Sequence, residues 1–209
     1  MYKDITGIIL SGGKSSRMGE NKSFLKIGNM TVIERTVNLM RSLFDRVIII
    51  SNEPELYFNL NVEIFTDIYK DVGPLAGIHS GLKHSFTENI FVISCDIPLM
   101  NSDMIKSIIE YPGDSFIKVP LADGYIQFLC GIYPKKSLQV IEEIITNDFS
   151  KENRSETQEK RKCKMTSLIN TYPSIIIDEI TNLNGYFKEI FFNMNNKNDY
   201  KQIIELLNK

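Results

Sequence analysis

The sequence predicts an α/β protein with a mostly parallel β-sheet that is covered by helices on both faces. Several short runs consist almost wholly of apolar residues, which is typical of strands buried on both sides. Helical periodicity separates several of these runs, and this alternation favours parallel strands joined by helical crossovers. The strands are expected at 5–10, 47–50, 62–65 and 90–94, and the helices at 33–44, 75–86 and 104–110.

The first of these helices has a clear start signal. Thr31 and Glu34 form a capping box, in which the Thr hydroxyl and the Glu carboxylate each satisfy an otherwise free backbone N–H. Ile33, Val37 and Met40 follow at helical spacing. The sequence therefore predicts a helix that begins after Thr31 and buries one face.

The second half of the chain continues the α/β pattern. Residues 147–164 are polar, charged and poor in apolar side chains, and they predict a long mobile loop. No repeat or clear linker divides the chain, so a single domain over residues 1–209 is expected. Further strands are expected at 116–119, 126–133 and 175–177, and further helices at 138–145 and 200–207.

Composition excludes several classes of protein. The formal net charge of −2 over 209 residues gives no general attraction to nucleic acid. Cys95, Cys130 and Cys163 are widely spaced and form no CxxC pair, so neither a zinc site nor a disulfide framework is expected. The sequence shows no signal peptide and no apolar run of membrane-spanning length. We therefore expect a cytoplasmic protein that binds neither nucleic acid nor a membrane.

A glycine-rich turn with two cations follows the first strand directly. Glycines let the backbone bring its N–H groups close to a phosphate, and Arg17 and Lys22 add positive charge nearby. Nucleotidyl transfer needs this combination, because charge builds on the bridging and leaving oxygens. Glu20 follows Gly19 and the glycines are adjacent, so the turn is neither a Walker A loop nor GxGxxG. The alternative is an ordinary glycine turn with surface cations.

Carboxylates follow two other predicted strands. In open parallel sheets, ligands bind beyond the carboxyl ends of the strands. Asp96 stands there after strand 90–94, and a hard oxygen anion suits Mg²⁺, which usually keeps only one or two protein carboxylates. Asp67 follows strand 62–65. The alternatives are a helix N-cap before Asn101 for Asp96 and a loop-capping role for Asp67.

Several segments resemble one family. Residues 10–22, LSGGKSSRMGENK, resemble the signature loop of the molybdenum cofactor guanylyltransferases, and 73–77, Gly-Pro-Leu-Ala-Gly, resemble a second element of that family. Cys95-Asp96-Ile97-Pro98 is similar to the family's metal-binding strand end. Residues 193–195, Asn-Met-Asn, resemble its late Asn-x-Asn element, although Asn196-Lys197 replaces the usual Thr-Pro.

The resemblance implies a fold, a reaction and a set of roles. The fold is a three-layer α/β/α, Rossmann-like nucleotidyltransferase domain, and the reaction transfers GMP from GTP to molybdenum-molybdopterin with release of pyrophosphate. Lys22, Arg17 and Asp96 are the implied catalytic residues, with Asp96 as the Mg²⁺ ligand. The implied nucleotide-binding residues are Leu10, Ser11, Gly12, Gly13, Lys22, Asp67 and Asp96.

Two alternatives remain open at this stage. One is a cytidylyltransferase or another nucleotidyltransferase of the same fold, although its typical Ala-Ala-Gly loop is absent; the other is a non-catalytic nucleotide-binding module. Proteins that deliver or accept the cofactor are further expected partners. Residues 160–164, Lys-Arg-Lys-Cys-Lys, form a basic run that is either a solvated face or a contact for the acceptor's terminal phosphate.

Overall fold

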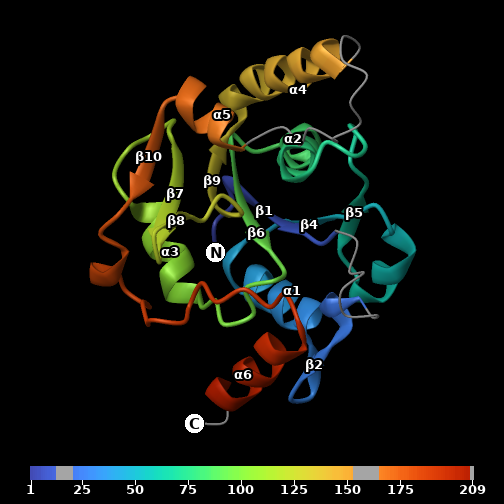
Figure 1. Ribbon diagram of the computed structural model, residues 1–209, viewed down its shortest axis with the longest axis vertical. Helices are drawn as coiled ribbons and strands as arrows, with labels where there is room; N and C mark the ends of the chain where they lie inside the picture. Colours follow the sequence, from blue (N-terminus) through green and yellow to red (C-terminus); the bar gives the residue numbers. More distant parts are fainter. Residues whose placement is uncertain (13–20, 153–164, 208–209) are drawn as a thin grey trace.

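The computed structural model describes residues 1–12, 21–152 and 165–207, with the side chains of 148–152 left out. Its centre is a mixed sheet of eight strands in which β1, β4, β5 and β6 are parallel to one another and β9 is antiparallel to β6 (Figure 1). The mostly parallel sheet expected from the sequence is therefore confirmed. In spatial order the strands are β10 (Ser174–Ile177), β7 (Ile117–Ala122), β9 (Cys130–Pro134), β6 (Asn89–Ser94), β1 (Ile5–Leu10), β4 (Val47–Ile50) and β5 (Glu63–Phe65), with β8 (Tyr125–Ile126) paired to β7.

Helices lie on both faces of this sheet, as Figure 1 shows with α2 and α4 on one side and α1 and α3 on the other. Successive residues of β1 point to opposite faces: Ile5 and Ile9 join one buried cluster, and Ile8 joins the other. Because both faces need apolar cover, the strands read as continuous apolar runs. The helices are α1 (Val32–Leu43), α2 (Pro74–His84), α3 (Ser102–Glu110), α4 (Leu138–Glu152), α5 (Met165–Thr171) and α6 (Lys197–Leu207).

The predicted start of α1 is confirmed. The Thr31 hydroxyl accepts a hydrogen bond from the Glu34 N–H at 3.3 Å, and the Thr31 N–H donates to the Glu34 carboxylate at 2.7 Å. Ile33, Val37 and Met40 are buried against the sheet. The capping box thus fixes where the helix begins, and the apolar stripe fixes which face it buries.

A small third cluster joins the C-terminal helix to a hairpin that the sequence analysis did not predict. The hairpin consists of β2 (Lys26–Ile27) and β3 (Met30–Thr31), and Figure 1 shows α6 beside β2. The Tyr200 hydroxyl donates to the Lys26 carbonyl at 2.5 Å. Ile27, Leu99, Met194 and Ile203 are buried together with Val32 at this junction. The segment before α6 is thereby held against the loop that follows β6.

Two predicted elements differ markedly from the structure. The strand expected over 126–133 is interrupted, because a turn closed by the Cys130 N–H and the Gln127 carbonyl at 3.0 Å separates β8 from β9. The helix expected over 138–145 continues to Glu152, so the first residues of the loop expected over 147–164 are helical. Polar composition misled the prediction here, because a polar segment can extend a helix whose earlier residues, Ile141 and Ile145, are buried. Residues 153–164, which include the basic run, lie outside the described residues.

Within the described ranges, no helix is both long and apolar enough to cross a membrane.

Candidate active site at the carboxyl ends of the parallel strands

The register of the sheet brings several predicted site segments to one edge. Leu10 at the end of β1 is paired with Ile50 of β4 on one side and with Ser94 of β6 on the other. Ile50 is in turn paired with Phe65 at the end of β5. The loops that follow these four strands therefore begin at the same edge, where ligands bind in open parallel sheets.

Lys22 and Asp96 form an ion pair at this edge. The Lys22 Nζ lies 3.3 Å from the Asp96 Oδ2, and the two side chains are 23% and 22% exposed. Asp96 comes just after β6, and Lys22 opens the short 3-10 helix η1 (Lys22–Phe24). Asn21 caps that helix, because its side-chain oxygen accepts from the Ser23 N–H at 3.1 Å. Two of the predicted catalytic residues, 74 positions apart, are thus in direct contact.

Met194 holds both members of the pair, and the sequence analysis did not single it out. Its carbonyl accepts a hydrogen bond from the Lys22 Nζ at 3.2 Å. Its N–H donates to the Asp96 carbonyl at 2.8 Å. The only available signal was the Asn-x-Asn element in which Met194 is the middle residue. This backbone contact explains why the late segment of the chain lies at the edge of the sheet.

The capping alternative for Asp96 is excluded. Asn101 is the N-cap of α3, and its Oδ1 accepts from the Met104 N–H at 2.9 Å. The Asp96 carboxylate is directed instead to Lys22, in a partly exposed position. A single accessible carboxylate fits Mg²⁺, which takes most of its ligands from phosphate and water oxygens. No cluster of three His, Cys, Asp or Glu side chains suited to a metal occurs in the part of the chain that the structure describes.

Asp67 is paired with Asn52 from the loop after β4. The Asn52 Nδ2 donates to the Asp67 Oδ2 at 2.8 Å, and the Asp67 N–H donates to the Asn52 Oδ1 at 3.3 Å. Burial raises the pKa of the Asp67 carboxyl above its usual value, and the hydrogen bond from Asn52 acts in the opposite direction. Gly77 of α2 is close by: an added Cβ there would lie 3.7 Å from the Asp67 Oδ1 and 2.9 Å from Leu10. Glycine lets α2 approach the strand end.

Gly73 and Pro74 form the turn at the start of α2. Gly73 has a φ of 93°, which favours glycine, and Pro74 is the first residue of the helix. Asp71, in the same turn, is exposed with a φ of 62°. The first turn of α2 lies beside Asp67, because Gly77 is close to that carboxylate.

The glycine loop is described only at its start. Ser11 is completely buried, and its hydroxyl points into the interior, where it contacts Ser23, Tyr57 and Cys95. Gly12 is exposed, and an added Cβ would meet nothing within 4 Å. Gly13 and Arg17 lie outside the described residues, so their predicted roles stay predictions.

The two asparagines of the late element are both exposed. Asn193 is exposed and donates from its Nδ2 to the Phe191 carbonyl at 3.4 Å. Asn195 is exposed, and its N–H donates to the Asp199 carboxylate at 2.7 Å. Both side chains flank the Met194 backbone that contacts Lys22 and Asp96. Their contacts are those of a turn before α6.

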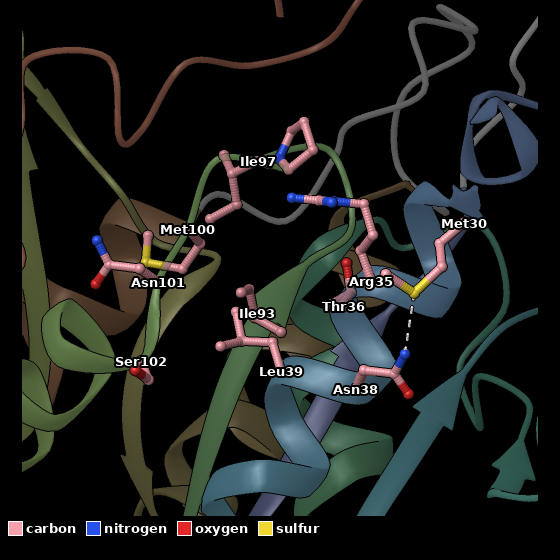
Figure 2. Close-up of a pocket in the computed structure, with 11 residues that line it drawn as sticks. Met30, Arg35, Thr36, Asn38, Leu39, Ile93, Ile97, Met100, Asn101 and Ser102 are labelled. Carbon is pink, nitrogen blue, oxygen red and sulfur yellow. Dashed lines mark hydrogen bonds between the residues drawn. The ribbon is translucent and has the colours of Figure 1, made fainter. Parts of the chain in front are cut away.

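A pocket of about 330 Å³ lies next to this edge, on the α1 face of the sheet. Figure 2 shows Arg35 extending from α1 toward Ile97, with Ile93 and Leu39 below it and Met100 to the left beside Asn101. The lining is mostly apolar and includes none of the predicted site residues. A triphosphate needs several cations and N–H groups, so this pocket does not fit one.

Comparison with known proteins places the chain in a family. Residues 7–161 match the model of the MobA-like NTP transferase domain. The chain is 34% identical over 198 residues to the probable molybdenum cofactor guanylyltransferase of Clostridium perfringens, covering 94% of each chain. It is 30% identical over 209 residues to the protein of that name from Carboxydothermus hydrogenoformans, covering 98% of this chain and 97% of the relative.

A solved structure supports the fold. The molybdopterin-guanine dinucleotide biosynthesis protein A from Archaeoglobus fulgidus aligns with a TM-score of 0.76 at 20% identity, over 97% of this chain and 98% of that one. Three observations support the same assignment as a nucleotidyltransferase: the three-layer arrangement, the pairing of Lys22 with Asp96, and the sequence matches. The chain therefore belongs to the molybdenum cofactor guanylyltransferases, which are nucleotidyltransferases with a MobA-like NTP transferase domain.

Proposed function

We propose that this chain transfers GMP from GTP to molybdenum-molybdopterin, giving the guanine dinucleotide form of the cofactor and pyrophosphate. The observation that carries the proposal is the Lys22–Asp96 pair at the carboxyl ends of β1 and β6. It brings a cation and a hard oxygen ligand to the place where a nucleotide triphosphate would lie in this fold. The choice of the molybdenum cofactor as acceptor and of guanine as the base follows the names of the curated relatives.

The reaction needs alignment and charge neutralisation more than proton transfer. The acceptor's terminal phosphate is already anionic, so its oxygen attacks the α-phosphorus without a general base. The bond between the α-phosphorus and the oxygen bridging to the β-phosphate breaks, and pyrophosphate leaves with that negative charge. Lys22 stabilises the charge that builds on these oxygens, and Arg17 is proposed to assist it. When bound at Asp96, Mg²⁺ neutralises phosphate charge.

In this arrangement Lys22 changes partner when the substrates bind. Without substrate its ammonium group is held by Asp96 and by the Met194 carbonyl, at 3.3 and 3.2 Å. An arriving triphosphate offers several stronger anionic acceptors for the same three N–H donors. The ion pair thus keeps the lysine directed at the site until the phosphates arrive.

Asp67 is the proposed contact to the nucleotide beyond the phosphates. Its Oδ2 already accepts a hydrogen bond from Asn52, and burial disfavours its charged form. Guanine presents two adjacent donors, N1–H and the exocyclic amine, which a carboxylate accepts well. Donors from the base would compensate the desolvation of Asp67, and cytosine has no matching pair of donors. This contact would give GTP an advantage.

The proposal is tested by measuring pyrophosphate release from purified protein with Mg²⁺, molybdenum-molybdopterin and one of GTP, CTP or ATP. We expect GTP to be favoured by at least about tenfold in kcat/KM, which corresponds to roughly 1.4 kcal/mol. A reaction without the acceptor and one with the Lys22→Ala variant control for other sources of pyrophosphate. A preference for CTP would replace the guanylyl assignment with a cytidylyl one. No pyrophosphate with any nucleotide, from folded protein that binds GTP, would favour the non-catalytic module.

A further inference from the structure

Four buried side-chain polar groups lie next to the Lys22–Asp96 pair in the fold, and the proposed reaction gives these side-chain groups no role. They are the hydroxyls of Ser11, Ser23 and Tyr57 and the thiol of Cys95, and we call them the carboxyl-end cluster. All four residues are at most 4% exposed. They come from four separate segments: the end of β1, the helix η1, the 3-10 helix η2 (Pro54–Leu60) and the end of β6.

The contacts in this cluster form a closed triangle with one extension. The Ser11 Oγ lies 3.0 Å from the Ser23 Oγ and 3.3 Å from the Cys95 Sγ, and the Ser23 Oγ lies 3.1 Å from the Cys95 Sγ. The Tyr57 hydroxyl lies 2.9 Å from the Ser11 Oγ. Every contact joins two groups that are each able to donate or accept.

The number of donor hydrogens in the cluster equals the number of contacts. Each of the four groups carries one hydrogen, and there are four contacts to be made. Suppose that Tyr57 donates to Ser11, and that Ser11, Ser23 and Cys95 each donate to the next member of the triangle. Every contact then has its own hydrogen. Ser11 then donates once and accepts twice, which is the full capacity of a hydroxyl. A buried network satisfied in this way is rigid, because any displacement breaks a hydrogen bond that no water can replace.

The position of the triangle along the chain connects it to the site. Ser23 is the residue after Lys22, Cys95 is the residue before Asp96, and Ser11 begins the glycine loop. The Ser23–Cys95 contact therefore joins the immediate neighbours of the two paired residues. A lysine side chain is long and flexible, so the position of its ammonium group depends on how firmly its backbone is held.

We propose that the carboxyl-end cluster is a positioning element that fixes η1 against the end of β6 and so holds Lys22 and Asp96 in register for phosphate transfer. Ser23 and Cys95 are its central positioning residues and touch no substrate. The kinetic part of this inference rests on the proposed function, whereas the structural part does not. Preorganised charge needs such support, because a misplacement of about 1 Å costs on the order of 10²-fold in rate.

The first test compares Ser23→Ala with a matched control at the other end of β1. The control is Ser85→Ala, because the Ser85 hydroxyl is equally buried and contacts the Thr6 hydroxyl at 3.0 Å and the Thr87 hydroxyl at 2.8 Å. We expect Ser23→Ala to lower kcat by roughly tenfold or more while the KM for GTP stays within about twofold. Ser85→Ala should lose comparable stability and keep its kcat. Equal kcat values for Ser23→Ala and the parent would overturn the proposal.

A second pair of variants separates positioning from space filling. Cys95→Ser keeps one donor and the acceptors of the triangle, whereas Cys95→Ala removes them. We expect Cys95→Ser to stay within about threefold of the parent kcat and Cys95→Ala to fall to the level of Ser23→Ala. If Cys95→Ala is as active as Cys95→Ser, the thiol only fills space and the proposal fails. This pair also serves if Ser23→Ala does not fold.

The third test needs no activity. Hydrogen exchange of backbone amides is measured for residues 21–25 and 94–96 in the parent, in Ser23→Ala and in Ser85→Ala. We expect exchange at both segments to be at least about tenfold faster in Ser23→Ala and unchanged in Ser85→Ala, because the cluster is what ties η1 to β6. Unchanged exchange in Ser23→Ala would overturn the proposal. A parent protein that is inactive with every nucleotide would refute the proposed function and leave this result standing.

Discussion

Strand β1 has a cluster of hydroxyl groups, buried or half-buried, at each end, and the two clusters contact different parts of the protein. At the amino end, the Thr6 and Thr87 hydroxyls lie 2.8 Å apart, and Ser85 contacts both. Thr87 also donates to the Asn89 carbonyl at 2.7 Å. Apart from Thr6, all of these partners lie within the short turn from α2 into β6. The amino-end triangle of Thr6, Ser85 and Thr87 therefore closes one local turn against β1.

The carboxyl-end cluster uses the same chemistry to join four segments of the chain, whereas the amino-end triangle joins only β1 and one turn. Ser11 and Ser23 are 12 positions apart, and Ser23 and Cys95 are 72 apart. Lys22 and Asp96 are their sequence neighbours and are partly exposed. The difference shows that a cluster of buried hydroxyl groups does not by itself indicate a role in catalysis. What gives one cluster a role in the reaction is the end of the sheet at which it lies, because substrates bind at the carboxyl ends of parallel strands.

The largest effect is expected at the surface of the carboxyl end. Lys22→Ala should lower kcat by roughly 10²–10³, the usual cost of removing one donor to transition-state charge. The unfolding free energy should change little, because the Lys22 side chain is partly exposed and paired with a partly exposed carboxylate. Steady-state kinetics and urea denaturation measure the two quantities on the same protein. Turnover within a factor of two of the parent would remove Lys22 from the mechanism.

Asp96→Asn is expected to change the metal requirement. The amide keeps the shape of the side chain but removes the charge that a hard cation prefers. The Mg²⁺ concentration for half-maximal activity should therefore rise by roughly tenfold or more at saturating GTP. Titration of activity with Mg²⁺ measures the shift, and Asn101→Ala, which removes the cap of α3 instead, is a matched control for loss of stability. An unchanged titration curve would show that Asp96 is not a Mg²⁺ ligand and has only a structural role.

The sequence predicts the strands next to the site well because they are short, almost wholly apolar and bounded by polar or glycine residues. β1 and β4 have the predicted bounds, 5–10 and 47–50. The same logic places Asp96 and the glycine loop at one edge, since parallel neighbours end together. By contrast, the turn at Gln127 carries no glycine or proline, so the strands around it were merged. The hairpin at 26–31 has a usable signal in Gly28-Asn29, where Gly28 has a φ of 62°.

The contacts within the site were harder to foresee. A backbone carbonyl such as that of Met194 looks the same at every position, so only the fold reveals that it accepts from Lys22. The carboxyl-end cluster depends on four segments meeting, and no local pattern marks Ser23 or Tyr57 as partners of Ser11. The capping alternative for Asp96 also needed the structure, because Asn101 and Asp96 are both plausible caps by residue type.

The smallest effect on activity, and the sharpest check on the comparison, is expected from Ser85→Ala at the amino end. The Ser85 Oγ accepts from the Thr87 N–H at 3.1 Å and contacts two further hydroxyls, so the variant leaves the buried Thr6 hydroxyl and two groups of the half-buried Thr87 with fewer partners. We expect the unfolding free energy to fall by about 1–2 kcal/mol, seen as a lower urea midpoint with an unchanged slope. The kcat and the Mg²⁺ titration should match the parent, because no residue of the amino-end triangle adjoins Lys22 or Asp96. If Ser85→Ala instead reduced kcat as much as Ser23→Ala at equal stability, the two ends of β1 would be equivalent. The distinction drawn between the clusters would then be wrong.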